Sequence, residues 1–220
     1  AINVKEVDVR VIKIYEDNVL QFLQENNINS NSEYAIKRVG RRVAKQTITL
    51  IHNKEKNTQK WKAYSIDISK MIATEPGAIY RVELSFNKHQ TFYNCSENTS
   101  SIAESDDYDD EVSNLNEETK EELYWDNKLY RYKNYRYNWR QRDNPCHDAY
   151  YSANRMISQN LLASNLGVIA KKGEDNAYLF AVTNILNTNP EHNAKIQLFN
   201  FQQQEIAHGT TNSEGIVSIH

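Results

Sequence analysis

The stretch NLLASNLGVIAKKGEDNAYLFAVTNILN, which runs from Asn160 to Asn187, contains two apolar segments joined by a polar turn. In both segments apolar residues recur at every second position: Leu166, Val168 and Ala170 before the turn, then Tyr178, Phe180 and Val182 after it. A period of two residues is typical of an extended strand with one buried face. The stretch therefore predicts a β-hairpin.

The residues that follow the hairpin continue the strand pattern. AKIQLFNF predicts a third strand, QQQEIAHG a fourth, and TTNSEG a tight turn into the last segment, IVSIH. No long helix interrupts these segments, so a parallel α/β fold, which needs helical crossovers, is not expected. Antiparallel strands of this kind are typical of a β-sandwich domain. Since such a sandwich has about seven strands, we expect the domain at 158–220 to be incomplete.

The N-terminal part shows the same period. In VKEVDVRVIKIY, the three valines Val7, Val9 and Val11 fall on one face, while Asp8 and Arg10 fall on the other. RVAKQTITLIHN, from Arg42, is also strand-like. NVLQFLQENNIN fits a short helix and a second strand equally well, because its apolar residues suit either period, so this element stays open. In KWKAYSIDISKMI the alternating residues are Tyr64, Ile66 and Ile68.

EPGAIYRVELSF has the clearest strand signal of this part. Pro76 followed by Gly77 is typical of a type II turn. After the turn, the apolar side chains of one face are Tyr80, Val82, Leu84 and Phe86, and the polar ones of the other are Arg81, Glu83 and Ser85. We therefore expect an antiparallel strand with one wet face, within a β-sandwich domain at 1–95.

The segment 96–157 has a different composition. Its first part is dense in acidic residues and almost free of large apolar ones, which predicts a flexible excursion. Calcium binding is an alternative for the acids Asp106, Asp107, Asp109, Asp110 and Glu111. The spacing lacks the glycine and the terminal glutamate of an EF-hand loop, so we do not favour calcium.

From Tyr124 to Tyr151 the segment becomes basic and aromatic. Interleaved Arg, Lys, Tyr and Trp can form a stacking platform for single-stranded nucleic acid or for sugar. The plainer interpretation is that Tyr130, Tyr132, Tyr135 and Tyr137 pack on a sheet. The net charge of −3 over 220 residues also argues against a nucleic-acid partner.

The chain has two cysteines, Cys95 and Cys146, which match no metal or redox spacing. As a pair they predict one structural disulfide in an exported protein, and two reduced thiols are the alternative. The adjacent Cys146 and His147 could form a thiol nucleophile with its base, but adjacency in sequence is weak support for that pairing.

Signatures of catalysis, metal binding and membrane insertion are missing from the sequence. It contains no P-loop, no G-x-G-x-x-G, no G-x-S-x-G and no His-Glu-x-x-His. No apolar run is long enough to span a membrane. The six histidines are scattered without metal-ligand spacing: His52, His89, His147, His192, His208 and His220. We therefore expect neither an enzyme, a cofactor nor a metal site.

Several segments together resemble the macroglobulin-like domains in the N-terminal part of bacterial alpha-2-macroglobulin-family proteins. They are VDVRVIKIYEDNVLQFL, EPGAIYRVELSF, RDNPC, NLLASNLGVIAKKG, FAVTNIL and QQQEIAHGTTNSEG, and the most specific of them are NLLASNLGVIAKKG and the turn at 210–215. The resemblance implies an all-β fold of tandem immunoglobulin-like antiparallel β-sandwich (macroglobulin) domains.

The family resemblance also implies a function. Family members are exported, often membrane-anchored envelope proteins that trap proteases, and many carry a reactive thioester in a Gly-Cys-Xaa-Xaa-Gln motif. Here Cys95 precedes Ser-Glu-Asn and Cys146 precedes His-Asp-Ala, so neither matches that motif.

We therefore expect non-catalytic scaffold domains of an extracytoplasmic protease inhibitor. Their partners would be neighbouring macroglobulin domains and, through the intact protein, proteases, with membrane attachment only through an anchor elsewhere. An independent binding module of a surface protein, such as an adhesin or glycan binder, is the alternative.

Overall fold

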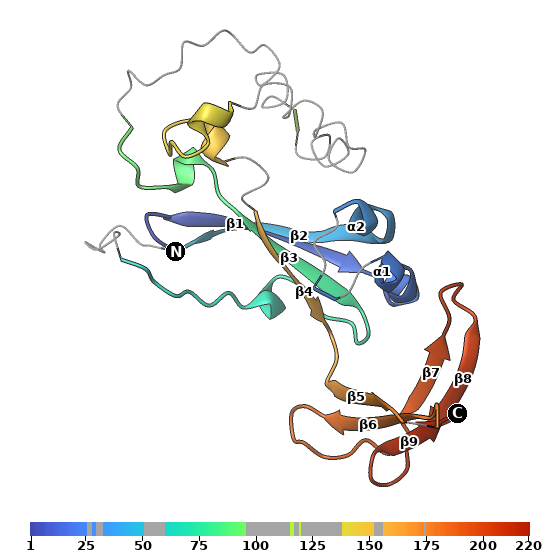
Figure 1. The fold of residues 1–220 in the computed structure, drawn as a ribbon. Helices are drawn as coiled ribbons and strands as arrows, with labels where there is room; N and C mark the ends of the chain where they lie inside the picture. The colour runs from blue at the N-terminus through green and yellow to red at the C-terminus, as the bar shows by residue number, and fades with distance from the viewer. Residues whose placement is uncertain are drawn as a thin grey trace. The chain divides into compact units, whose positions relative to one another are not determined.

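The computed structural model describes residues 1–25, 28–29, 33–50, 60–95, 115–116, 119, 138–151, 156–173 and 175–220. These residues form β-sheets with a few short helices, which confirms the all-β prediction (Figure 1). The chain divides into two compact units, 1–12 with 41–73 and 81–159, and 13–40 with 74–80 and 160–220. The domain limits expected from the sequence, 1–95, 96–157 and 158–220, remain a prediction. No helix in the described part of the chain has the length and hydrophobicity to span a bilayer.

A four-stranded sheet contains the N-terminal strands. Its members are β1 (Glu6–Ile14), β2 (Gly40–Thr49), β3 (Ile79–Ser85) and β4 (Ile157–Leu162), in the order β2-β1-β3-β4 (Figure 1). The strands predicted around Val7 and Tyr80 and after Arg42 are confirmed. The fourth strand comes from beyond the predicted first domain, so the sheet joins residues that lie far apart in the sequence.

The central strands of this sheet are buried on both faces. In β1 the predicted inner residues Val9 and Val11 are fully buried, and so are Ile12 and Ile14 on the opposite side. In β3, Arg81 and Glu83 are each 2% exposed. The prediction that these two polar residues line a wet face is therefore wrong, because a strand covered on both sides has no such face.

The element left open by the sequence is helical. A short 3-10 turn (η1, Glu16–Asn18) leads into α1 (Val19–Glu25), and α2 (Glu33–Val39) precedes β2. The Asn18 side-chain amide donates a 3.1 Å hydrogen bond to the carbonyl of Val39. Phe22 of α1 and Ile36 of α2 are buried, so both helices contribute apolar side chains to the interior.

The segment with Tyr64 and Ile66 keeps its predicted alternation of half-buried and exposed residues without forming a strand. It ends in a 3-10 turn, η2 (Ile68–Lys70), where Asp67 accepts a 3.1 Å hydrogen bond from the backbone of Ser69. The predicted turn before β3 is present. Gly77 has a φ of +87°, as a type II turn requires, and the Ala78 amide donates to the Glu75 carbonyl at 3.3 Å.

The predicted C-terminal strands are all present. β5 (Leu166–Lys172), β6 (Tyr178–Asn184) and β9 (Ile216–Ile219) form a sheet in the order β5-β6-β9, and β7 (Lys195–Phe199) pairs with β8 (Glu205–Thr210). β5 and β6 are antiparallel, with Val168 opposite Val182 and Ala170 opposite Phe180. The opening stretch of the sequence is therefore a hairpin, as predicted.

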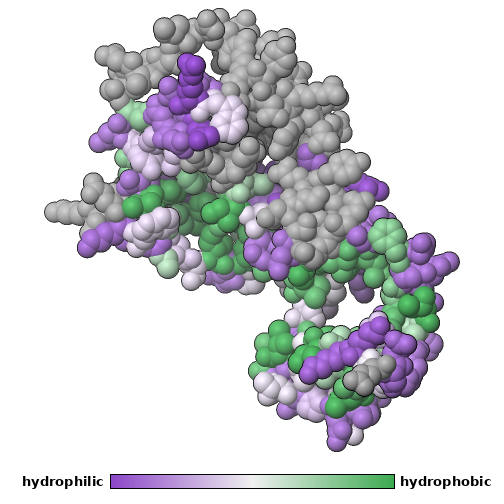
Figure 2. Space-filling view, in the orientation of Figure 1, coloured by the Kyte–Doolittle hydropathy of each residue, from purple (hydrophilic) through white to green (hydrophobic). Residues whose placement is uncertain are grey.

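These two sheets contact each other between β8 and β9. A Cβ atom added to Gly209 of β8 would lie 2.7 Å from the side chain of Val217 on β9. The core beneath contains Phe180 and Val182, which are 7% and 1% exposed. The β7–β8 layer does not extend over β5, where Leu166 and Val168 are 48% and 54% exposed. Figure 2 shows hydrophobic residues at the surface of this part of the chain.

Substituting Gly215 by Ala should lower the free energy of unfolding by about 2 kcal/mol. Gly215 has a φ of +73°, and an added Cβ would lie 2.4 Å from the backbone oxygen of Val182. Gly167→Ala is the matched control, because its Cβ would meet mainly the exposed side chain of Ile185. Urea unfolding of both variants measures the difference, and equal losses would contradict the assigned turn.

Candidate functional site

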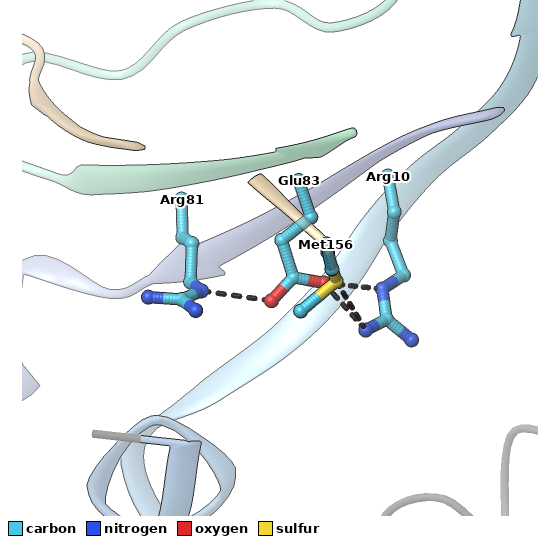
Figure 3. A network of polar contacts seen from close by, with 4 residues as sticks. All are labelled: Arg10, Arg81, Glu83 and Met156. Atoms are coloured by element: carbon cyan, nitrogen blue, oxygen red, sulfur yellow. Dashed lines mark hydrogen bonds and ion pairs between the residues drawn. The ribbon is translucent and has the colours of Figure 1, made fainter. Parts of the chain in front are cut away.

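A buried cluster of charges lies on the four-stranded sheet (Figure 3). One carboxylate oxygen of Glu83 accepts a 2.7 Å hydrogen bond from Nε of Arg81. The other oxygen accepts one of 2.5 Å from Nε of Arg10. The side chains of Arg81 and Glu83 are each 2% exposed, and that of Arg10 is 21% exposed. The cluster therefore lies inside the protein and not on a solvated face.

The strands explain why these three residues meet. Arg81 and Glu83 are two positions apart on β3, so they share a face of the sheet. Arg10 comes from β1, the neighbouring strand. A terminal nitrogen of Arg10 also lies 3.9 Å from the sulfur of Met156, just before β4. The cluster connects side chains from β1, β3 and the approach to β4.

The geometry of this cluster indicates a structural role, in which its hydrogen bonds link β1 to β3. Each carboxylate oxygen of Glu83 is held by a guanidinium group, in charge-assisted hydrogen bonds that are stronger than neutral ones. A buried carboxylate needs such partners because its removal from water is costly. A sequence signal for this burial existed in the adjacent apolar pair Val11 and Ile12, which places apolar side chains on both faces of β1.

A second group of polar side chains links segments of the same sheet through hydrogen bonds. Oδ1 of Asp8 on β1 accepts hydrogen bonds from Oγ1 of Thr47 on β2 at 2.6 Å and from Nε2 of Gln90 at 2.8 Å. Gln90 ends a 3-10 turn, η3 (Lys88–Gln90), which is fixed by a capping box from Asn87. Asp8 of β1 thus binds both β2 and the segment that follows β3.

The two cysteines form the predicted disulfide, with a Cα–Cα distance of 5.4 Å. The alternative of two reduced thiols is therefore wrong, and so is the alternative of a Cys146 nucleophile, because its sulfur is bonded to Cys95. The neighbouring His147 accepts a 3.0 Å hydrogen bond from the Ala149 amide through Nδ1. This histidine caps a local turn, η6 (Asp148–Tyr151), and does not approach a thiolate.

Aromatic side chains contact one another between the two segments that carry the cysteines. The Tyr151 hydroxyl donates a 2.6 Å hydrogen bond to the Pro145 carbonyl, and its ring contacts Phe86 edge to face at 6.0 Å. The rings of Tyr93 and Tyr150 are 6.2 Å apart. A hydrogen bond with Tyr150, together with burial, raises the pKa of Tyr93 above its ordinary value. The bridge therefore joins two segments that also pack through their aromatic side chains.

The basic, aromatic segment is described only from Asn138 onward. Trp139 begins a 3-10 turn, η5 (Trp139–Gln141), and is 66% exposed. The guanidinium of Arg142 lies 5.0 Å from the centre of its ring, so a cation already occupies one face of the indole. The tyrosines Tyr130, Tyr132, Tyr135 and Tyr137 lie outside the described residues, as do the acids of the calcium alternative, Asp106, Asp107, Asp109, Asp110 and Glu111.

The described histidines do not gather in one place. Within the described ranges, no group of three or more His, Cys, Asp and Glu side chains is placed to hold a metal ion. His208 pairs with Glu205 at 2.8 Å on the exposed side of β8, whereas His52 lies outside the described residues. No constellation of catalytic side chains appears among these residues.

Replacing Gln197 by Ala should raise the pKa of Glu205. A hydrogen bond from Gln197 is the main cause that holds this pKa below its ordinary value, with His208 as a further contributor. Because the folded-state pKa is depressed, the stabilisation is present above the ordinary pKa and is lost as the pH falls through the folded one. NMR titration of the Glu205 carboxyl checks this, with Gln204→Ala as the control. An unchanged titration in Gln197→Ala would contradict it.

Comparison with known proteins points to one family. Residues 163–220 match the family described as the bacterial alpha-2-macroglobulin MG3 domain. The chain is similar to a crystal structure of native alpha-2-macroglobulin from Escherichia coli that spans domains NIE-MG1, at 15% identity and a TM-score of 0.52. That likeness covers 100% of this chain and 76% of the solved one, and it supports the fold.

A longer fragment of the same Escherichia coli protein, spanning MG0-NIE-MG1, is similar at 14% identity and a TM-score of 0.49. That likeness covers 99% of this chain, which spans 49% of the length of the longer fragment. The family match is described as MG3, whereas the solved fragments are described as ending in MG1. No curated protein matches the sequence.

Proposed function

We propose, because residues 163–220 match the bacterial alpha-2-macroglobulin MG3 domain, that the chain is a non-catalytic scaffold region of an envelope protease inhibitor. The family match of the C-terminal strands is the observation that carries this proposal. The buried Arg10–Glu83–Arg81 cluster and the disulfide agree with it, because both fix strands and segments to one another.

The proposed role leaves the trapping chemistry to other parts of the intact protein. Neither cysteine has the Gly-Cys-Xaa-Xaa-Gln sequence of a thioester, and both are joined to each other. A sulfur held in a disulfide cannot form the thioester from which an acyl group would be transferred to an attacking protease. The contribution of this chain is then mechanical: two rigid units that support their neighbours while cleavage and collapse occur elsewhere.

The domain limits of 1–95 and 158–220, with a connecting segment at 96–157, belong to this proposal. We infer that further strands extend the β7–β8 sheet and complete the second sandwich. The exposed Leu166 and Val168 support this, because they share the inner face of the sheet with the buried Phe180 and Val182. A longer product of the same gene should therefore bind less ANS than the 220-residue chain, and equal binding would contradict the completion.

The partners and location follow from the family. We propose that the chain contacts neighbouring macroglobulin domains of its own polypeptide, meets proteases only through the intact protein, and functions in the periplasm or at the cell surface. The disulfide supports an oxidising location, because such bonds persist mainly outside the reducing cytosol. Attachment to a membrane would depend on an anchor outside this chain.

The test of function compares the full gene product with the 220-residue chain. A protease treated with the full product should lose activity on a large protein substrate but retain it on a small chromogenic peptide, because a trapped enzyme still admits small molecules. The 220-residue chain alone should change neither rate.

Two controls make this result interpretable. Full product with Cys95→Ser and Cys146→Ser tests whether the scaffold must be rigid, and protease inactivated beforehand sets the background. Inhibition of both substrates by the 220-residue chain would contradict a scaffold role. Failure of the full product to protect the large substrate would remove the protease trap.

A further inference from the structure

We propose that the outer edge of β5, which pairs with no other strand among the described residues, pairs with β5 of a second copy of this chain, so that two three-stranded sheets join into one continuous antiparallel sheet. β5 is the end strand of its sheet, in the order β5-β6-β9. An edge strand presents backbone donors and acceptors that another strand can use. The proposal goes beyond the scaffold role and does not depend on it.

The hydrogen-bond register shows which groups of β5 are available. The Gly173 amide donates to Ala177 and the Ile185 amide donates to Asn165, both at 2.8 Å. Because bonded pairs alternate in an antiparallel ladder, the odd-numbered residues of β5 bind β6 and the even-numbered ones point outward. Val168 and Ala170 therefore direct their amides and carbonyls away from the sheet. The outward amide of Leu166 is taken by the Ser164 hydroxyl at 3.0 Å.

The side chains of β5 do not protect this edge. Val168 on one face is 54% exposed, and Ile169 on the other is 65% exposed. The strand LGVIAKK contains no proline, and its charges, Lys171 and Lys172, are both at its end. Natural edge strands usually carry a charge, a proline or a bulge along their length to prevent pairing. From Leu166 to Ala170 this edge has none of these.

A second copy of β5 is a suitable partner because the strand is complementary to itself. In an antiparallel pair with its two-fold axis at Ile169, the two Ile169 side chains face each other and Val168 faces Ala170 of the second copy. The same register places Lys172 opposite Leu166 and Lys171 opposite Gly167. Lysines of the two copies are thus never directly opposed, and like charges directly opposed would destabilise the pair. Two-fold pairing of this kind is also the commonest symmetry of soluble dimers.

Sedimentation of the 220-residue chain over about 10 μM to about 1 mM tests the proposal. The mean mass should rise from 25.7 kDa toward twice that value. Ile169→Arg, which places two arginines at the axis, should weaken association at least about tenfold, since opposed like charges repel. Ile206→Arg is the control, because Ile206 is similarly exposed at 63% but lies on β8.

A second pair of variants separates edge pairing from contact between apolar faces. Ala170→Pro removes one outward amide from β5 and leaves the β5–β6 ladder bonded, so it should also weaken association about tenfold. Ser218→Pro does the same at the opposite edge of the sheet, on β9, and should leave association unchanged. Circular dichroism and the urea midpoint confirm that each variant folds. If a proline variant does not fold, the comparison of Ile169→Arg with Ile206→Arg still tests the proposal.

Two results of the sedimentation experiments would overturn the proposal. One is a monomer throughout the concentration range. The other is a dimer that Ile169→Arg and Ala170→Pro leave intact while Ile206→Arg weakens it, which would assign association to an apolar face. Hydrogen exchange should slow at Val168 and Ala170 on association and stay constant at Ser218, and the reverse pattern would also exclude the β5 edge.

Discussion

Replacing Glu83 by Ala should lower the free energy of unfolding by about 3 to 5 kcal/mol, which is the usual cost of removing one partner from a buried ion pair. Glu83 is 2% exposed and receives hydrogen bonds from Arg81 at 2.7 Å and from Arg10 at 2.5 Å. The variant takes the shared carboxylate away from two guanidinium groups. Arg81, which is equally buried, cannot move into water without opening the sheet.

The control for this substitution is an exposed ion pair. Lys70 lies 3.9 Å from Asp67, with side chains that are 81% and 53% exposed. Lys70→Ala should therefore cost less than about 1 kcal/mol, since solvent screens such pairs. Urea unfolding of both variants gives the comparison. A Glu83→Ala loss as small as that of Lys70→Ala would show that the cluster is not buried in solution.

A combined variant distinguishes charge from packing. Replacing Arg10 and Arg81 by Met together with Glu83→Leu removes all three charges and keeps most of the volume. Buried ion clusters can be exchanged for apolar residues at little or no net cost, so this triple variant should be more stable than Glu83→Leu alone. A triple variant less stable than Glu83→Leu would mean that the arginines make stabilising contacts without the carboxylate.

The same cluster shows where sequence patterns stop being informative. Alternation at Val7, Val9 and Val11 correctly predicted a strand with a buried face. Alternation at Arg81 and Glu83 equally correctly predicted a strand, but whether its polar side meets water depends on what covers the sheet. The segments that cover this face come from distant parts of the sequence. The local periodicity of β3 therefore cannot predict that its polar side chains are buried. The adjacent apolar residues of β1 were the only local sign.

Other elements also differ in how well the sequence predicts them. The hairpin of β5 and β6 was predictable because its turn residues and its period agree. The helix α1 was not, since Val19, Leu20, Phe22 and Leu23 fit either period and only packing selects one. The disulfide could be predicted from a count of two cysteines, whereas the aromatic contacts between the two linked segments could not, because Phe86, Tyr93 and Tyr151 come from distant parts of the sequence.

Removing the disulfide should lower the free energy of unfolding by about 4 kcal/mol, according to the chain-entropy model for a closed loop of about 50 residues. Cys95 and Cys146 are 51 positions apart, and the segment between them is rich in acidic residues. The bond restricts the unfolded chain far more than the folded one. Cys95→Ser with Cys146→Ser, compared with the oxidised protein in urea, measures the effect.

The controls separate the covalent bond from the side chains near it. Tyr151→Phe removes the 2.6 Å hydrogen bond to the Pro145 carbonyl and leaves the bridge intact, so it should cost only about 1 kcal/mol. A reductant should lower the unfolding midpoint of the parent protein to near that of the serine variant and should leave the variant itself unchanged. Equal midpoints for the oxidised parent and the serine variant would contradict the prediction.

The slope of the urea transition identifies the state on which the bond acts. If the bridge mainly compacts the unfolded chain, its removal exposes more surface on unfolding, and the m-value should rise along with the loss of stability. If it mainly supports native packing between the segments that carry Tyr93 and Tyr150, the m-value should stay constant and the hydrogen bond that raises the pKa of Tyr93 should be lost, which lowers that pKa. The length of the closed loop favours the first outcome, because the entropic constraint grows with loop size whereas local packing does not.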